Sequence, residues 1–407
     1  MFIRPARHRI PVLAAVLAAA LLASHAVGAN GGAAQRVVVV GDVHGDLDAF
    51  TSILQLASVI DGQRKWKAGS TILVQTGDYL DRGPRVREVL DLFMSLEREA
   101  AAAGGKVIVL LGNHEVMNLI GDLRDIEPEV YQGFVDAESD KRRQKAWEEY
   151  EAAARAQRQR ATDAVPAATY HDRDKWLASR PPGYVEYREA MSAKGKYGKW
   201  IRQRPAAVKV QDLLLVHGGI NPDFVQKPLD EINAQVRSEL DRFDRVQRLL
   251  VDRGLAASSF DLQELVDAAR VEIERAVAVS QGATDDRLRP RIDGPDLQQV
   301  MDLLRIGTWY VLNENGPLWY RGYAKWTNDD AVKRLEPMLE RYGVARVVVG
   351  HTTLANSRIA GRFSNRVFLI DTGMLSAYYK GRASALEFRE GKAAALYVED
   401  EPVRFDP

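Results

Sequence analysis

Short runs of aliphatic residues recur along this chain, and most of them end in a loop that carries histidine or aspartate. RVVVV at residues 36–40 leads into GDVHGD, and STILVQT at 70–76 leads into GDYLDRGP. Apolar residues at helical spacing follow each loop, over residues 47–60 and about 85–103. A third run, KVIVLL, then leads into GNHEVMN. Alternation of strand, polar loop and helix predicts an α/β domain built in layers, with parallel strand pairing.

Most histidines of the chain follow one of these strand-like runs. Five of the seven lie beyond residue 30, and four of these five follow a strand-like run. They are His44, His114, His217 and His351, and Asp78 and Asp371 follow runs of their own in the same way. One such histidine is more often structural, whereas four in one position favour a shared site. Because ligand sites in open α/β sheets form at the carboxyl ends of the strands, we expect these side chains to meet there.

The chain has 407 residues without a cysteine, and its 56 basic residues balance 56 acidic ones. The absence of cysteine excludes disulfides, thiolate metal sites and a cysteine nucleophile. Balanced charge gives no electrostatic reason to expect nucleic acid as a partner. Histidine nitrogen combined with aspartate and asparagine oxygen suits Mn, Fe, Zn or Ni ions and does not select among them.

The first 29 residues predict an export signal. Three arginines precede the apolar run PVLAAVLAAALLA, and the small residues of SHAVGAN offer cleavage sites after Ala26 or Ala29. The run is short for a membrane span, with an uncleaved anchor as the alternative. We therefore expect an exported protein, periplasmic or secreted, without stable membrane insertion after cleavage.

We expect one domain over residues 35–400 that two helical insertions interrupt. Residues 123–205 are charged and helical with few aliphatic anchors, and a second helical block with a Pro/Gly/Asp-rich loop covers 229–295. Strand-like VKVQDLLLVHGG lies between them. Near the end of the chain, ASALEFRE and AAALYVE flank a Glu-Gly-Lys turn and predict a hairpin. The role of the insertions stays open, with capping of a cleft as one option.

The spacing of the polar residues supports a pair of metal ions. Asp42 and His44 alternate along an extended segment, so their side chains point the same way. Two ions about 3.5–4 Å apart share a bridging ligand. Asp78 is the candidate for this role, because it is the carboxylate of a separate strand end.

Five motifs occur in order between Gly41 and His351: GDVHG, GDYLDRG, GNHE, HGG and GH. In this set the chain resembles the metallophosphoesterase (calcineurin-like) superfamily, and within it the phosphoprotein phosphatase branch. GNHEVMN, GPLWYRGY and VVVGHT are similar to the Shewanella-like protein phosphatases of bacteria and plants. The resemblance implies an α/β fold, a layered β-sandwich flanked by helices, to which the helical insertions are added.

The resemblance also implies a role for each matching residue. One metal ion would take Asp42, His44 and Asp78, and the second would take Asp78, Asn113, His217 and His351. Asp81 and His114 would form the catalytic pair, and Arg82 would bind phosphate. The chemistry agrees, because Asp81 can hold one tautomer of His114 and the planar guanidinium of Arg82 can grip two phosphate oxygens.

Arg321, in PLWYRGY, is the candidate for a second phosphate-binding arginine. Trp319, Tyr320 and Tyr323 beside it would then form walls for a flat leaving group such as the phosphotyrosine ring, with packing in the core as the alternative. Asp371 would either orient a metal ligand or serve only the fold.

These assignments predict a binuclear-metal-dependent phosphomonoesterase, a protein phosphatase for phosphotyrosine or phosphoserine/threonine. A hydroxide that bridges two divalent metal ions would attack phosphorus directly, and His114 would protonate the leaving oxygen. The substrate would be a phosphorylated protein or a small phosphoester. IDTGM stands where eukaryotic members carry SAPNY, which leaves the choice between tyrosine and serine/threonine open. The alternatives are a diester or dinucleoside polyphosphate hydrolase on the same fold, and a non-catalytic metal-containing binding protein.

Overall fold

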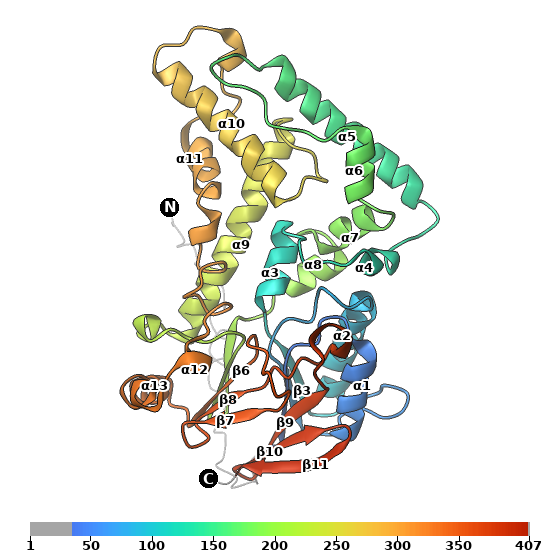
Figure 1. Ribbon diagram of the computed structural model, residues 1–407, viewed down its shortest axis with the longest axis vertical. Helices are drawn as coiled ribbons and strands as arrows, with labels where there is room; N and C mark the ends of the chain where they lie inside the picture. Colours follow the sequence, from blue (N-terminus) through green and yellow to red (C-terminus); the bar gives the residue numbers. More distant parts are fainter. Residues whose placement is uncertain (1–34, 406–407) are drawn as a thin grey trace, which may run out of the picture. The chain divides into compact units, whose positions relative to one another are not determined.

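Two β-sheets packed face to face form the base of the protein, with helices on their outer faces and a helical part beside them (Figure 1). This computed structural model describes residues 35–405. The predicted export signal, residues 1–29, lies outside the described residues. The predicted α/β fold, a layered β-sandwich flanked by helices, is confirmed.

The first sheet has six strands in the order β11-β10-β9-β1-β2-β3. They are β1 (Val37–Val40), β2 (Ile72–Gln75), β3 (Lys106–Val109), β9 (Ser384–Arg389), β10 (Lys392–Tyr397) and β11 (Asp400–Phe405). Strands β1, β2 and β3 pair in parallel, as predicted from the alternating pattern. Strand β9 adds antiparallel to β1, and β9 and β10 form the predicted hairpin.

The second sheet has five strands in the order β4-β5-β6-β8-β7. They are β4 (Ala207–Val210), β5 (Leu213–Val216), β6 (Arg346–Val349), β7 (Ala360–Arg362) and β8 (Val367–Leu369). The strand-like stretch VKVQDLLLV forms the antiparallel hairpin β4–β5. The chain reverses there at two exposed polar residues, Gln211 and Asp212, and the φ of 53° at Gln211 is left-handed.

Alternation along the strands divides their side chains between two cores. Val37 and Val39 of β1 face the second sheet, where they pack in one cluster with Leu215 of β5. Val38 and Val40 face the other way, into the larger core that includes the helices. The outer helices are α1 (Leu47–Leu56) and α2 (Val86–Ala102) on the first sheet, and α13 (Asn328–Tyr342) on the second.

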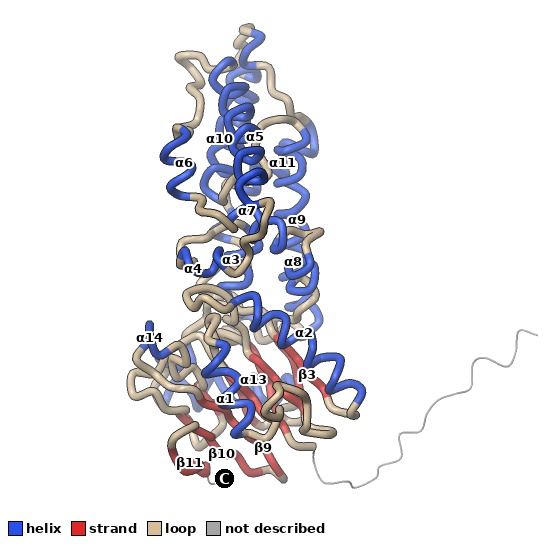
Figure 2. Tube along the Cα trace, turned by 90° about the vertical axis from the view of Figure 1, so that its right-hand side faces the viewer, coloured by secondary structure: helices blue, strands red, loops and turns tan. Residues whose placement is uncertain are grey.

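The helical part lies on the side of the sheets where α3 (Asn113–Ile120) leaves β3 (Figures 1 and 2). Residues 123–205 contain α4 (Pro128–Gln132), α5 (Ser139–Gln159), α6 (Arg173–Ser179), α7 (Tyr184–Met191) and α8 (Lys196–Ile201). Residues 229–295 contain α9 (Leu229–Asp252) and α10 (Leu262–Ser280). Helix α11 (Gly294–Leu303) begins at the end of this range and extends beyond residue 295. These helices therefore adjoin the carboxyl ends of the parallel strands.

The helices not yet named are short. They are α12 (Gly322–Lys325), α14 (Ser376–Tyr379) and the 3-10 turns η1 (Pro222–Phe224), η2 (Asp286–Leu288) and η3 (Ile306–Thr308). Helix α13 begins at a capping box on Thr327 and ends at the left-handed Gly343, which are standard helix boundary signals. Among the helices within residues 35–405, none has both the length and the apolar character that crossing a bilayer requires.

Candidate active site

The parallel strands of both sheets place polar side chains at their carboxyl ends. Asp42 and His44 follow β1, Asp78 follows β2, Asn113 and His114 follow β3, His217 follows β5, His351 follows β6, and Asp371 follows β8. All of these side chains are buried. Contacts between them, described below, join the ends of the two sheets in one site.

Asp78 is the residue that most of the others approach. Its Oδ2 lies 3.1 Å from Nε2 of His217 and 3.9 Å from Nε2 of both His44 and His114. Within residues 35–405, two groups of side chains have the spacing of metal ligands: Asp78 with His44 and His114, and Asp78 with His217 and His351. Because Asp78 belongs to both groups, it could bridge two ions.

Hydrogen bonds to backbone carbonyls decide which histidine nitrogens face this centre. Nδ1 of His217 donates to the carbonyl of Thr76 at 2.9 Å. The other ring nitrogen, Nε2, therefore faces Oδ2 of Asp78 at 3.1 Å and Oδ1 of Asn113 at 3.0 Å. One nitrogen and two oxygens that face one another can all be ligands of a single cation. The donor set therefore fits a divalent metal ion.

Asp42 lies against the second group. Its two oxygens accept the backbone N–H of His351 at 3.1 and 3.2 Å. The first group contains His114 where the resemblance implied Asp42. Burial, and then the charges of Asp371 and Asp78, raise the pKa of Asp42 well above its ordinary value. Cations among these carboxylates would offset the repulsion.

Asp371 is held by hydrogen bonds of its own. Thr353 donates to its Oδ2 at 2.6 Å, and the backbone N–H of Gly373 donates to its Oδ1 at 2.9 Å. Burial raises the pKa of Asp371. The charge of Asp371 is also one of the causes that raise the pKa of Asp42.

The loops that carry these groups contain left-handed backbone. His44, Asp78, Asp81, Arg82 and His351 have φ values of 45°, 58°, 66°, 64° and 66°. Residues other than glycine avoid this region, so five strained positions in one site need a surrounding structure that holds them.

Glu115 holds the loop after β2. Its carboxylate accepts the backbone N–H groups of Asp78, Tyr79, Leu80 and Gly112, at 2.7, 2.9, 3.0 and 2.8 Å. Burial, followed by the charge of Asp78, raises the pKa of Glu115 to about 7. Sequence reasoning missed this role, although the acid of GNHE directly after two site residues was the available signal.

The structure joins His114 to Asp81. Nδ1 of the imidazole lies 2.6 Å from Oδ2 of Asp81, and both side chains are buried. Burial alone would lower the pKa of His114, but the charge of Asp78 and the hydrogen bond to Asp81 outweigh it and raise the pKa to about 9. The bond to Asp81 leaves Nε2 directed toward Asp78, 3.9 Å away.

Arg82 lies between the first group and two tyrosines of α14. Its Nη1 is 2.7 Å from Nε2 of His44 and donates to the hydroxyl of Tyr379. The guanidinium carbon lies 5.0 Å from the ring centre of Tyr378 and 5.2 Å from that of Tyr379, within cation–π range. Sequence reasoning did not connect these tyrosines with the site, and an adjacent aromatic pair just after IDTGM was the only sign.

Arg321 lies beside the second group. It donates to the backbone carbonyl of His351 at 2.9 Å, and Oγ1 of Thr352 is 3.3 Å from the same nitrogen. Nε2 of His351 donates to the carbonyl of Trp319 at 3.2 Å, so Nδ1 is the ring nitrogen that remains for another partner. Arg82 and Arg321 therefore lie next to different metal-ligand groups.

The aromatic residues around Arg321 divide between the site and the core. Trp319 is half-buried, and the centre of its ring lies 5.8 Å from that of His351, a candidate metal ligand. Tyr320 and Tyr323 are buried and pack on Trp326. The expectation that these two tyrosines form walls for a leaving group is wrong, because they fill the core beneath α13.

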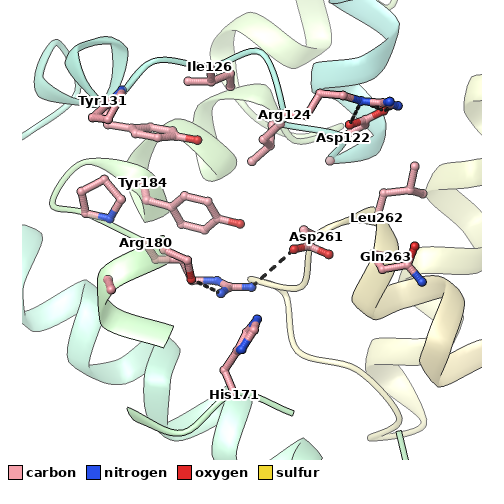
Figure 3. A pocket seen from close by; sticks show the side chains of 16 residues that line it. Asp122, Arg124, Ile126, Tyr131, His171, Arg180, Tyr184, Asp261, Leu262 and Gln263 are labelled. Atoms are coloured by element: carbon pink, nitrogen blue, oxygen red, sulfur yellow. Dashed lines mark hydrogen bonds and ion pairs between the residues drawn. The ribbon is translucent and has the colours of Figure 1, made fainter. Parts of the chain in front are cut away.

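A separate cavity of about 720 Å³ lies in the helical part (Figure 3). Its lining includes the loop residues Gly121–Arg124 and Ile126, together with Tyr131, Tyr184, Arg180 and Asp261. Figure 3 shows the guanidinium of Arg180 directed toward Asp261. The same loop carries Asp125, whose Oδ2 lies 4.0 Å from Nδ1 of His114. One loop therefore separates this cavity from the His114–Asp81 pair.

The order of the motifs and the geometry of the site agree with a known family. A family model described as calcineurin-like phosphoesterase matches residues 35–353. The chain belongs to this calcineurin-like phosphoesterase family. The matched span contains both candidate metal groups, the His114–Asp81 pair and both arginines. The family predicted from the motifs is thus confirmed, and with it the enzyme class, a metal-dependent hydrolase of phosphoric esters.

Individual relatives add detail to this membership. Shewanella-like protein phosphatase 2 of Arabidopsis thaliana is 30% identical over 220 residues, which cover 51% of this chain and 52% of the plant protein. The chain therefore spans about half the length of that relative. Shewanella-like protein phosphatase 1 of Plasmodium berghei (strain Anka) is 21% identical over 345 residues, 83% of this chain and 67% of that protein.

A solved structure supports the fold. The cold-active protein-tyrosine phosphatase of a psychrophile Shewanella sp. matches with a TM-score of 0.57 and 24% identity. The match covers 92% of this chain and 81% of that chain, so it includes both the sandwich and the helical part. The predicted resemblance to Shewanella-like protein phosphatases is confirmed by these similarities.

Proposed function

We propose that this protein is a binuclear-metal-dependent phosphomonoesterase that removes phosphate from phosphorylated proteins. One observation carries the proposal: Asp78 belongs to two groups of metal-ligand type, with Arg82 and the His114–Asp81 pair next to them. A structural metal site has no use for a buried acid held by a carboxylate, or for an arginine at its edge.

Two divalent ions, each Mn, Fe, Zn or Ni, would be held by ligand sets that share Asp78. One set would be Asp42, His44 and Asp78, and the other would be Asp78, Asn113, His217 and His351. When bound, such ions activate water and neutralise charge on the phosphoryl group. The left-handed backbone of these loops and the Glu115 anchor would hold the ligands in place before any ion binds.

The two arginines would bind the phosphate from different sides. Arg82 lies beside His44 and Arg321 lies beside His351, so their guanidinium groups flank the two ligand sets. Each guanidinium can donate to two phosphate oxygens, which orients the group and offsets its charge in the transition state.

His114 would donate a proton to the leaving oxygen. Its Nδ1 is bound to Asp81, so the proton that it can give is on Nε2, on the side of the metal-ligand groups. Asp81 would stabilise the imidazolium and prevent the ring from turning. This role matters most for leaving groups that are strong bases.

Tyr378 favours phosphotyrosine as the substrate. Its side chain is 54% exposed, yet its ring lies 5.0 Å from the guanidinium of Arg82. A phenyl ring whose phosphate is bound by Arg82 would find an aromatic surface beside it. Phosphoserine offers no ring for that contact.

The test is metal-dependent phosphate release by the full chain. The protein would be freed of metal with a chelator and reloaded with Mn, Fe, Zn or Ni in turn. We expect release from a phosphotyrosine peptide, more slowly from a phosphoserine peptide, and only after reloading. Faster hydrolysis of diadenosine tetraphosphate would favour the diester alternative, and no metal-dependent release from any phosphoester would overturn the proposal.

A matched pair of variants separates chemistry from folding in this test. His114→Asn should lower turnover of both peptides by at least about 100-fold, the usual contribution of a general acid. His171→Asn makes the same change at an exposed histidine of the first insertion, and it should leave turnover unchanged. Full activity of the His114 variant on both peptides would remove the assigned role.

We also propose that the protein acts after export, in the periplasm or outside the cell, on the strength of the signal predicted at residues 1–29. Cell fractionation with N-terminal sequencing of the mature protein is the test. A start after Ala26 or Ala29 in an extracytoplasmic fraction is expected, whereas an intact N-terminus in the cytoplasm would overturn this assignment.

A further inference from the structure

Asn118, the last residue of GNHEVMN, contacts both members of the His114–Asp81 pair. Its Nδ2 donates to Oδ1 of Asp81 at 2.7 Å and to the backbone carbonyl of His114 at 2.8 Å. Asp81 keeps its other oxygen for Nδ1 of His114. Asn118 is completely buried, so water does not compete for these bonds. The amide therefore determines how the carboxylate of Asp81 is turned toward the imidazole.

The remaining polar atom of Asn118 is bound by a residue of the first helical insertion. Tyr187 of α7 donates its hydroxyl to Oδ1 of Asn118, across 69 positions of the chain. An amide turned the other way would place its oxygen against the carboxylate of Asp81, where two acceptors would face each other. Tyr187 thus supports the one orientation of Asn118 that serves Asp81.

Helix α7 holds Tyr187 firmly. The phenol ring packs edge-on against Tyr131 and Phe134, with centroid distances of 5.5 and 5.0 Å. The next residue, Arg188, has one nitrogen 3.5 Å from the carbonyl of Asn118, and another donates to the carbonyl of Phe260 at 3.2 Å. The first insertion therefore contacts α3 at Asn118, the residue that binds both His114 and Asp81.

We propose that Asn118 and Tyr187 are positioning residues for the proton donor, and that the helical insertion takes part in catalysis through them. This inference rests on the proposed function, in which His114 protonates the leaving oxygen. Hydrogen bonds run from Tyr187 through Asn118 and Asp81 to His114. Loss of the phenol hydroxyl lets the amide, and with it Asp81, adopt other orientations, so the imidazole is aimed at the leaving oxygen for less of the time.

The dependence on the leaving group distinguishes this role from a merely structural one. p-Nitrophenolate leaves without much help from an acid, whereas phenolate and the serine alkoxide need a proton. A misaligned His114 therefore slows phenyl phosphate and phosphoserine peptide but spares p-nitrophenyl phosphate. Damage to the fold or to the metal ligands would slow all three substrates together.

The experiment compares kcat and KM for these three substrates in wild type, Tyr187→Phe and Asn118→Ala, each as the full chain loaded with metal. For Tyr187→Phe we expect kcat on phenyl phosphate and phosphoserine peptide to fall about tenfold, a part of the full contribution of a general acid. KM should not change, and p-nitrophenyl phosphate should stay within about twofold of wild type. Asn118→Ala should show the same selectivity with a larger loss.

Tyr197→Phe is the matched control. Tyr197 is a buried tyrosine of α8 in the same insertion, and its hydroxyl bonds to Asp91 of α2 at 3.0 Å, away from the catalytic pair. We expect it to leave all three substrates unaffected. Tyr187→Phe loses only a hydroxyl group, so it should remain folded and give a result even if Asn118→Ala does not fold.

Two outcomes would overturn the inference while the proposed function stands. One is an equal loss on all three substrates in Tyr187→Phe, and the other is no loss on any of them. A wild-type chain that releases no phosphate from any of the three would overturn both proposals together.

Discussion

The strand-end loops and the helical part are held together by different kinds of contact. In the loops, one buried carboxylate, Glu115, accepts four backbone N–H groups, and left-handed residues stand next to the candidate ligands. In the helical part, side chains bind side chains, as when buried Arg275 meets Glu272 and Gln157. The loops thus fix the backbone of the site, while the helices support it through single side chains such as Tyr187.

Substitutions in the two regions should therefore have different effects. A change in the loops moves ligands and should alter chemistry, whereas a change inside the helical part should alter stability first. Among the contacts described above, those of Tyr187 and Arg188 with Asn118 join the two effects.

The largest effect is expected in the loops, at the residue shared by both metal-ligand groups. Asp78→Asn keeps the shape of the side chain but removes the charge that two cations would share. We expect kcat for the phosphotyrosine peptide to fall by roughly 10³-fold, or about 4 kcal/mol. Metal content, measured by mass spectrometry, should fall with it. Asp212→Asn, at the exposed β4–β5 turn, is the control, and retained activity and metal in Asp78→Asn would break the comparison.

A change in the interior of the helical part should instead cost stability. Arg275→Met removes one partner of a fully buried ion pair, in which Nη1 lies 3.2 Å from Glu272. We expect the free energy of unfolding to drop by about 2 kcal/mol in urea titrations, because Arg160 remains 3.2 Å from Glu272 and still compensates its charge, with kcat per folded molecule unchanged.

The control for Arg275→Met is an exposed ion pair elsewhere in the helical part. Arg155→Ala breaks the bond to Glu151 on α5 and should cost less than about 1 kcal/mol. A loss of kcat in Arg275→Met without a loss of stability would contradict the separation of the two regions.

Glu115→Gln tests the anchor of the loop after β2. The amide keeps one acceptor oxygen but turns an NH₂ group toward backbone N–H donors. We expect the free energy of unfolding to fall by about 2 kcal/mol, together with a lower metal affinity. Thermal unfolding with and without added metal measures both. A variant that loses stability but binds metal as tightly as wild type would show that the anchor serves the fold alone.

The smallest effect is expected at the exposed aromatic surface. Tyr378→Ala should raise KM for the phosphotyrosine peptide about fivefold, which corresponds to about 1 kcal/mol of ring contact. KM for the phosphoserine peptide should stay the same, and Tyr378→Phe should behave as wild type. Equal changes for both peptides would mean that the ring acts through Arg82 and not on the substrate.

Sequence reasoning succeeded where local pattern and strand order decide the structure. The alternation of apolar runs with polar loops predicts the parallel strands, and strand ends place Asp42, His44, Asp78, His217 and His351 in one site. It failed where partners are distant in sequence. Tyr379 meets Arg82 across 297 positions, and nothing in the motif around either residue points to the other.

The aromatic residues show the same limit. Tyr320 and Tyr323 stand beside a motif arginine, but Trp326 and α13 draw their rings into the core. Helices α11 and α13 were likewise not predicted, although the capping box on Thr327 and the glycine after Tyr342 were available local signals for α13. The split of VKVQDLLLV into a hairpin depends on two exposed polar residues in an otherwise strand-like run.

The family, the strands and the residue types at the strand ends could all be predicted from the amino-acid sequence, because hydrophobic period and motif order are local properties of the chain. Which side chains support the residues of the site depends on tertiary packing. Glu115 beneath the loop, Tyr378 beside Arg82, and Tyr187 behind Asn118 depend on how the helices pack on the sandwich, and that packing brings together residues with no shared local pattern.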